Sequence, residues 1–250
     1  MAKLTPDKTT VEHGLTIHEK IIPWGAVWTK SYGNFVAGSK YKADRLMTGG
    51  SGRILGITVH NTEGVADAET YTRATYPNQN MGSARVHYYV DDKEAWQNLL
   101  DNEVGWHSGM GNYSTGNESY IAVEIIMNGK AIADNDAARR NGALLCAILM
   151  KRHGLSISDI VTHSHWKSSK RCPLYLLDDW GGFLREIEEQ YDIISGKVTN
   201  DNTPDLYAKD AVCKAVDKGI IKGDEGGNLM LHSPITRQDL LVILERIGAI

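Results

Sequence analysis

The chain has 250 residues, which is room for one large domain or for a medium-sized domain with a small appendage. Hydrophobic residues make up 42% and charged residues 23% of the sequence, a balance that excludes wholesale disorder. The net charge of -4 argues against nucleic acid as a partner, because nucleic-acid-binding domains carry a basic field. The charge is uneven, since residues 1–50 form a basic N-terminal arm with seven basic and four acidic side chains. Such an arm is typical of a solvated face, or of a surface that approaches anionic polymers.

No apolar run approaches the roughly 20 residues of a membrane span, so none is expected. Residues 1–10 lack the apolar core of a secretory signal, which predicts synthesis in the cytoplasm without a signal peptide. Three cysteines are too few for a disulfide framework. Cys146 and Cys213 lie in helical apolar patterns and are predicted to be buried packing residues. Cys172 lies in a polar loop and needs another explanation.

In chain order, apolar strands alternate with helical patterns, which predicts an α/β fold with a mixed central sheet flanked by helices. This first domain is expected to span residues 1–195. Its predicted strands cover residues 17–22, 24–28, 54–60, 85–90, 120–126 and 160–163. Its predicted helices cover residues 67–76, 136–153 and 183–191, and Gly154 is expected to end the second of them.

A polar, turn-rich stretch at residues 196–204 reads as a linker. Residues 205–250 follow as a small helical module, with predicted helices at 205–219 and 236–247. Thr236 with Asp239 resembles a capping box at the start of the second helix. About fifty residues are marginal for an independent core, so the module is expected to pack on the first domain, on another copy or on a ligand.

Histidines at predicted strand ends and one loop cysteine are candidate metal ligands. His60 ends the first buried strand, His163 and His165 end the fourth, and Cys172 follows in the next loop. Two imidazoles and a thiolate form a three-ligand set for Zn²⁺ that leaves one position open, as in catalytic sites. Spacing alone leaves open that the histidines are structural. It also leaves His163 and His165 equivalent, because residues two apart share a face of an ideal strand.

Glu124 stands inside the apolar strand at residues 120–126. A carboxylate in such a strand is costly unless it has a partner or a chemical task. A structural ion pair and a catalytic base are therefore the two readings of this residue.

Five segments in this order resemble the zinc-dependent N-acetylmuramoyl-L-alanine amidases, the superfamily of phage endolysins, autolysins and peptidoglycan-recognition proteins. The resemblance covers about residues 15–190. It rests on ITVHNT at 57–62, HYYVDD at 87–92, GWH at 105–107, IAVEI at 121–125 and THSHWKSSKRCP at 162–173.

The resemblance implies Zn²⁺ as cofactor, with His60, His163 and Cys172 as its ligands. His163 is favoured over His165 because the family's second histidine commonly lies three residues before a tryptophan. Glu124 matches the family's general base or water-orienting glutamate. Lys170 matches a lysine that stabilises the tetrahedral oxyanion, although a solvated loop residue would also fit its position.

Three further residues are implied to contact substrate, namely Asn61 after the first ligand and Trp106 and His107 at the rim of the groove. His87 is expected to be structural within its strand. One branch of the family has a tyrosine where this chain has Val86, so the catalytic work is expected to fall to Glu124.

The resemblance implies a zinc-dependent peptidoglycan hydrolase of the endolysin type. It would cleave the amide bond between N-acetylmuramic acid and L-alanine of the stem peptide, after holin-dependent release to the wall. A non-catalytic peptidoglycan-binding module and a zinc peptidase of the stem peptide are the alternatives. Retention of Cys172 favours an enzyme over a binding module.

The C-terminal module resembles a single S-layer homology motif. The similarity rests on AKDAVCKAVDKGIIKG at 208–223 and LHSPITRQDLLVIL at 231–244. That family anchors proteins to secondary polymers of Gram-positive cell walls, usually with three copies. Residues 205–250 are thus expected to bind such polymers, to pack on the enzyme or to mediate oligomerisation.

Overall fold

The computed structural model describes residues 4–27, 38, 45–64, 66–75, 85–111, 113–127, 135–196, 202, 204–205, 207–223, 228–233, 235 and 237–250. The chain divides into two compact units, residues 1–196 and 197–250. Most of the expected linker at 196–204 lies outside the described residues. Among the described helices, none has the length and apolar character needed to cross a membrane.

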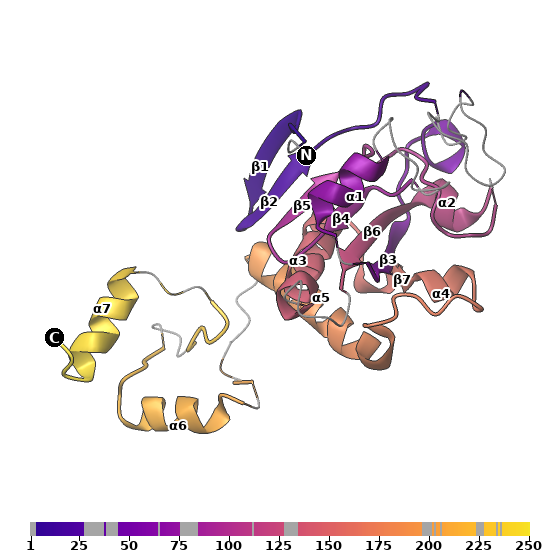
Figure 1. The fold of residues 1–250 in the computed structure, drawn as a ribbon. Coiled ribbons are helices and arrows are strands. Elements are labelled where there is room, and N and C mark those ends of the chain that lie inside the picture. The colour runs from indigo at the N-terminus through magenta and orange to yellow at the C-terminus, as the bar shows by residue number, and fades with distance from the viewer. Residues whose placement is uncertain are drawn as a thin grey trace. The chain divides into compact units, whose positions relative to one another are not determined.

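The first unit is built on a mixed seven-stranded sheet in the order β1-β2-β5-β4-β6-β3-β7 (Figure 1). The four strands β4, β6, β3 and β7 run parallel, whereas β1 with β2 and β4 with β5 pair antiparallel. The strands are β1 (Lys8–Glu12), β2 (Leu15–Glu19), β3 (Gly56–Thr62), β4 (Tyr88–Val90), β5 (Glu94–Gln97), β6 (Tyr120–Ile126) and β7 (Ile160–Thr162).

One face of the sheet is apolar and is covered by two long helices, α3 (Asn135–His153) and α5 (Trp180–Ile194). Successive side chains of a strand point to opposite faces, so alternate residues of β6 reach this core. They are Ile121, Val123 and Ile125, all fully buried. Helix α3 approaches closely at Gly142, where a Cβ atom would lie 2.4 Å from Cδ1 of Ile125.

The opposite face is covered only in part, because the short helix α1 (Ala68–Thr75) packs on β4 and β5. A small apolar cluster lies there, made of Ala68, Val86, Tyr89, Trp96, Ala122 and Ile126. Glu124 lies between Ala122 and Ile126 on the same side of β6. This face therefore has polar residues where β3, β6 and β7 end.

Short elements complete the unit: α2 (Thr115–Ser119), α4 (His163–Trp166) and the 3₁₀ turns Thr48–Gly50, Ile157–Asp159 and Leu177–Asp179. The expected strand at 120–126 is present with the same bounds, and the helix expected at 136–153 begins one residue earlier. Gly154 follows that helix with a φ of 64°, a left-handed conformation that glycine adopts without strain. The mixed α/β class is confirmed.

Several expected strands differ from the structure. Residues 17–22 form a strand only to Glu19, and the segment expected at 85–90 is extended in the sheet only from Tyr88. Trp24 and Gly25 form a turn instead of a strand, and Trp28 lies outside the described residues. Strands β1 and β5 were not expected, because their polar residues give no apolar run.

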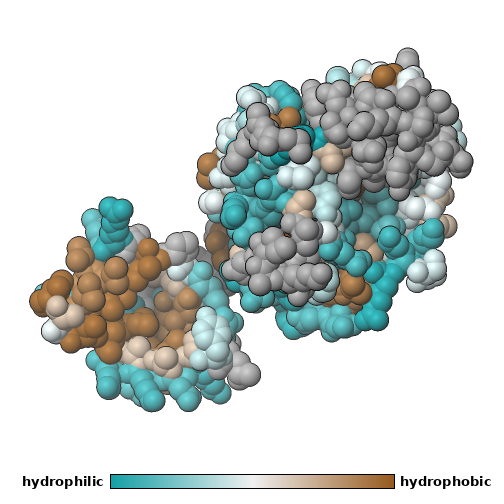
Figure 2. All heavy atoms as spheres, in the orientation of Figure 1, coloured by the Kyte–Doolittle hydropathy of each residue, from teal (hydrophilic) through white to brown (hydrophobic). Residues whose placement is uncertain are grey.

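The second unit contains α6 (Lys209–Asp217) and α7 (Arg237–Arg246), both shorter than expected. Neither helix buries a residue, and the prediction that Cys213 is buried is wrong, since its thiol is exposed. Figure 2 shows an apolar patch on this unit. Its exposed apolar residues include Val216, Ile235, Leu240, Leu241, Val242 and Ile247. The capping residue Thr236 lies outside the described residues.

Candidate metal centre and active site

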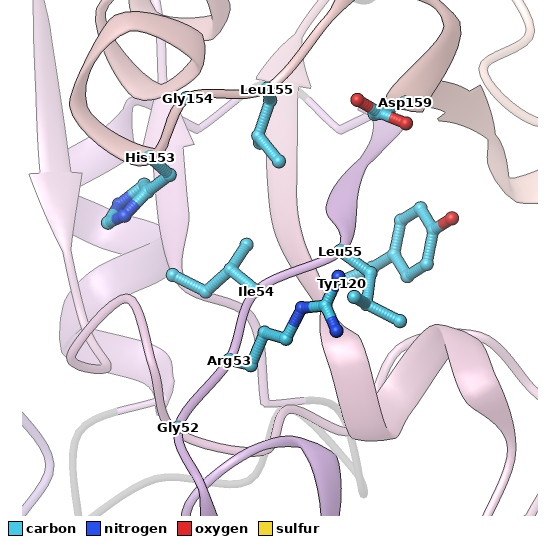
Figure 3. A pocket seen from close by; sticks show the side chains of 9 residues that line it. All are labelled: Gly52, Arg53, Ile54, Leu55, Tyr120, His153, Gly154, Leu155 and Asp159. Atoms are coloured by element: carbon cyan, nitrogen blue, oxygen red, sulfur yellow. The ribbon is translucent and has the colours of Figure 1, made fainter.

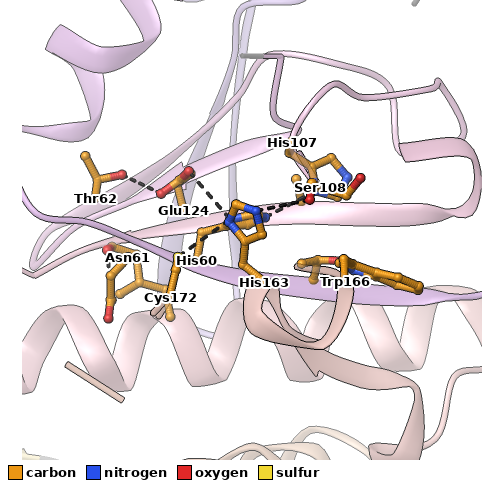
Figure 4. A network of polar contacts seen from close by, with 12 residues as sticks. His60, Asn61, Thr62, His107, Ser108, Glu124, His163, Trp166 and Cys172 are labelled. Carbon is orange, nitrogen blue, oxygen red and sulfur yellow. Dashed lines mark hydrogen bonds and ion pairs between the residues drawn. The ribbon is translucent and has the colours of Figure 1, made fainter. Parts of the chain in front are cut away.

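The parallel register of the sheet brings the candidate residues together. In the pairing of β3 with β6, His60 lies directly opposite Glu124. Strand β7 pairs with β3 on its other side, and the chain enters α4 at His163 immediately after β7 ends. Cys172 follows α4 in the next loop, and Figure 4 shows its side chain beside His60 and His163.

His60, His163 and Cys172 form a buried cluster of possible metal ligands, with one donor atom from each lying within 4.8 Å of the others. The Nδ1 atoms of His60 and His163 are 3.0 Å apart, and Cys172 Sγ is 3.9 Å from His60 Nδ1. Tetrahedral zinc with Zn–N of ~2.0–2.1 Å and Zn–S of ~2.3 Å separates such atoms by roughly 3.3–3.6 Å. The two separations lie about 0.3 Å on either side of this range, so the three donors form a possible site for one metal ion.

A hydrogen bond to the main chain also determines which ring nitrogen of His163 is available to bind a metal. Its Nε2 lies 3.2 Å from the carbonyl oxygen of Ser108, which can only accept, so Nε2 carries the proton. Nδ1 of His163 is then unprotonated and directs its lone pair at the cluster. A histidine that binds a metal through one ring nitrogen commonly donates the N–H of its other ring nitrogen to a carbonyl oxygen or a carboxylate.

Burial keeps the ligands uncharged in the absence of a cation. Desolvation lowers the pKa of His163 to about 4 and that of His60 well below its ordinary value, with the charges of neighbouring groups adding to the effect. Desolvation raises the pKa of Cys172 to about 12. Binding of a metal to this set would displace the thiol proton, because only a thiolate ligates.

The local backbone structure distinguishes the two candidate ligands His163 and His165. The sequence prediction placed both on one strand, but they lie in the helical turn α4. Residues two apart in a helix point in nearly opposite directions. The ring of His163 consequently turns toward His60, whereas His165 is exposed and its ring lies 4.6 Å from that of Trp166.

Glu124 lies beside the cluster, with Oε1 3.9 Å from His60 Nδ1 and one fifth of its side chain exposed. The hydroxyl of Thr62 donates a hydrogen bond of 2.6 Å to Oε2. Burial raises the pKa of Glu124 to about 7, although Thr62 and the charge of Lys170 act in the opposite direction. The carboxylate is thus oriented, and it can take up or release a proton near neutral pH.

Lys170 is exposed in the loop between α4 and Cys172. Its positive charge lowers the pKa of Glu124 and of His163, which places its field on the cluster. An exposed cation whose charge acts on the cluster is suited to a developing negative charge.

The three residues expected to contact substrate differ in burial and in their hydrogen-bond partners. Asn61 is buried, and its amide accepts from the Tyr175 backbone and donates to the Ile125 carbonyl, so it clamps the loop after Cys172. Trp106 is half-buried, and its backbone pairs with Arg85. His107 is only 7% exposed, and both of its ring nitrogens have protein partners. Substrate contact by these residues stays a prediction.

Structural roles are clear for two other side chains. His87 accepts from the Ala122 backbone through Nδ1 and donates to the Glu103 carbonyl through Nε2, as expected of a structural residue. Trp166 donates to the Thr58 hydroxyl at 2.9 Å and so ties α4 to β3.

Sequence reasoning did not identify Thr62 or Ser108. The alternation of β3 would have indicated Thr62, because it lies two residues after His60 on the same face. No local pattern indicates the Ser108 carbonyl, since its contact with His163 joins residues 55 positions apart.

A separate hollow of about 600 Å³ lies where β3 begins, at the opposite end of that strand from His60 (Figure 3). It is lined by Gly52, Arg53, Ile54, Leu55, Tyr120, His153, Gly154, Leu155 and Asp159. None of the candidate metal ligands or catalytic residues is among them.

Comparison with known proteins identifies the family. The N-acetylmuramoyl-L-alanine amidase model matches residues 50–174, which is half of the chain and contains all three metal-ligand candidates. The chain belongs to this amidase family. A second model, the S-layer homology domain, matches residues 201–241.

Relatives with this amidase domain agree with the assignment. The chain is 42% identical over 130 residues to N-acetylmuramoyl-L-alanine amidase XlyA of Bacillus subtilis, covering 51% of this chain and 42% of that protein. It is 39% identical over 132 residues to the amidase CwlH of the same species, covering 52% of each. The chain therefore spans about half the length of these curated relatives.

Among solved structures, a mutant endolysin from Bacillus subtilis is similar with a TM-score of 0.56 and 35% identity. The match covers 69% of this chain and 99% of that one. The structure of the catalytic domain of XlyA is also similar, with a TM-score of 0.54 and 35% identity over 68% of this chain and 98% of that one, so the expected amidase-like sheet with flanking helices is confirmed.

Proposed function

We propose that this protein is a zinc-dependent peptidoglycan hydrolase that cleaves the amide bond between N-acetylmuramic acid and L-alanine of the stem peptide. The observation that carries this proposal is the buried cluster of His60, His163 and Cys172 with Glu124 beside it, in a chain of the amidase family. A bound Zn²⁺ supplies Lewis acidity toward the amide carbonyl and toward a water molecule.

Glu124 is assigned as the general base. Its raised pKa and its fixed orientation suit it to accept a proton from the attacking water. The same carboxyl group then donates that proton to the departing nitrogen of L-alanine as the carbon–nitrogen bond breaks. Thr62 holds the carboxylate in place through its hydroxyl group.

Lys170 is assigned to the oxyanion that forms on the attacked carbonyl. Its exposed position lets the side chain reach a bound substrate, and its charge already acts on the cluster. A fixed positive charge at a developing oxyanion lowers the barrier more than it stabilises the uncharged amide.

The test combines metal content with the identity of the cleaved bond. Purified protein is expected to contain one zinc per chain, to lose wall lysis after chelation and to regain it with Zn²⁺. Mass spectrometry of digested walls should show whole stem peptides with free L-alanine amino termini. Lysis by metal-free protein would contradict the zinc role. Cuts within the stem peptide would favour a peptidase, and wall binding without cleavage would favour a binding module.

For residues 205–250 we propose binding to secondary cell-wall polymers, supported by the match to the S-layer homology domain and by the exposed apolar side chains of α7. The matched assay compares the full chain with residues 1–196 for co-sedimentation with purified walls, before and after removal of the secondary polymers. Equal binding of the two proteins would contradict this role.

A further inference from the structure

The ring of His107 lies between a candidate metal ligand and the main chain. Its Nδ1 is 3.2 Å from Nε2 of His60, and its Nε2 is 3.2 Å from the carbonyl oxygen of Tyr120. The two ring centroids are 5.2 Å apart and the ring planes lie at 86° to each other.

The contact with Tyr120 determines which nitrogen of His107 carries the proton. The Tyr120 carbonyl can only accept, so Nε2 of His107 is the protonated nitrogen. A neutral imidazole has one N–H, so Nδ1 of His107 is an acceptor, placed 3.2 Å from Nε2 of His60 where it can receive a proton from that nitrogen. With its proton on Nε2, His60 presents a lone pair on Nδ1 at 3.0 Å from the lone pair on Nδ1 of His163, and a cation between the two nitrogens would stabilise this arrangement.

The main chain around His107 is itself fixed. The backbone N–H groups of His107 and Ser108 both donate to Oδ1 of Asn117 at 2.8 Å, and Asn117 Nδ2 donates to the Gly111 carbonyl. Two consecutive residues thus contact both histidines of the cluster. Nδ1 of His107 lies next to Nε2 of His60, and the carbonyl oxygen of Ser108 lies next to Nε2 of His163.

We propose that His107 is a positioning residue that fixes the tautomer and ring orientation of His60, so that His60 presents Nδ1 to the metal. This inference rests on the metal role of His60 given under Proposed function. It differs from the expected substrate contact, because the two ring nitrogens of His107 are already used within the protein.

Two substitutions in the full chain separate these roles. His107→Phe keeps a ring of similar size but removes the acceptor, whereas His107→Asn retains an oxygen near the place of Nδ1. Zinc affinity is measured by competition with a chromophoric chelator. Loss of such a supporting partner typically costs about 10- to 100-fold in metal affinity, which is the expectation for His107→Phe. His107→Asn should bind zinc more tightly than His107→Phe, because it keeps an acceptor for the proton of His60. His165→Phe, at an exposed histidine outside the cluster, is the control and should bind zinc normally.

A spectroscopic measurement tests the tautomer directly. Long-range ¹⁵N–¹H spectra of the metal-free chain should show His60 protonated at Nε2, and His107→Phe should give a mixture of tautomers. A His60 protonated at Nδ1, or unchanged zinc affinity in His107→Phe, would overturn the proposal. A raised KM with normal zinc affinity would assign His107 to substrate instead. If the unsubstituted chain bound no zinc, the proposed function would fail, while the His60 tautomer would still decide this inference.

Discussion

Each face of the central sheet has a largely buried carboxylate, and the two carboxylates differ in how many hydrogen bonds they accept. Where the apolar face meets α3, Asp101 accepts hydrogen bonds from Tyr88, Arg152 and His153. On the opposite face Glu124 receives one hydrogen bond from the part of the chain that the structure describes, donated by the hydroxyl of Thr62.

The consequence is a difference in pKa. Burial alone would raise the pKa of Asp101, but its hydrogen-bonded partners lower it to about 2. Burial dominates at Glu124 and raises its pKa to about 7. A carboxylate with full partners stabilises the fold, whereas one with few partners is left able to exchange a proton. The comparison supports a structural role for Asp101 and the proton-transfer role proposed for Glu124.

The largest effect is expected from Glu124→Gln, which keeps the shape of the side chain but removes the base. Loss of a general base typically lowers the rate by about 10²- to 10⁴-fold. Zinc content and the free energy of unfolding should change little, because Glu124 is not one of the three clustered ligands. The measurement is kcat on purified walls together with metal analysis. Glu188→Gln, at an exposed position of α5, is the matched control. Near-normal kcat in Glu124→Gln would assign this residue to structure.

The second prediction concerns Ile121, three residues earlier on β6 but facing α3. Its side chain is fully buried in the apolar core. Ile121→Ala is expected to lower the free energy of unfolding by about 2–5 kcal/mol, through lost burial and the cavity that remains. Activity per folded molecule should be retained.

Urea unfolding with and without zinc measures this effect. Val11→Ala, on the exposed edge strand β1, should change stability by less than about 0.5 kcal/mol. A folded Ile121→Ala protein that no longer bound zinc would show that the two faces are not independent.

The third prediction concerns Asp101 and the pH dependence of the free energy of unfolding. Because the folded-state pKa of Asp101 lies at about 2, below its ordinary value of 3.8, its ionised form stabilises the fold above pH 4. This contribution, on the order of 2 kcal/mol, is lost as pH falls from about 4 to 2. Asp101→Asn should flatten the fall in unfolding free energy over that range. Identical pH slopes in the two proteins would contradict the assignment.

The same contrast explains what the sequence could predict. Strand β6 and helix α3 bury long apolar patterns, and their expected bounds agree with the structure within one residue. Strand β1 is largely exposed at the sheet edge, so its residues carry no periodic signal. Helix α4 has only four residues, and without it His163 and His165 could not be distinguished.

Much of the site depends on contacts that no local pattern contains. Glu124 and His60 were recognisable because each is a polar residue in an apolar strand. His107 acquires its partner from a strand 47 positions away, and a loop sequence cannot reveal that burial. Cys213 shows the opposite error, since a helical apolar pattern predicted a core that the second unit does not form around it.

The smallest effect is expected at Thr62, where Thr62→Val removes the hydroxyl that donates to Glu124 without changing the size of the side chain. One hydrogen bond contributes about 0.5–1.5 kcal/mol, which corresponds to a two- to tenfold fall in kcat. Because this bond lowers the pKa of Glu124, its loss should raise that pKa and move the acidic limb of the pH–rate profile to higher pH. Thr62→Ser keeps the donor and should restore both the rate and the profile. A slower Thr62→Val enzyme with an unshifted profile would mean that the hydroxyl supports packing and not the carboxylate, and the two faces would then differ less than their pKa values indicate.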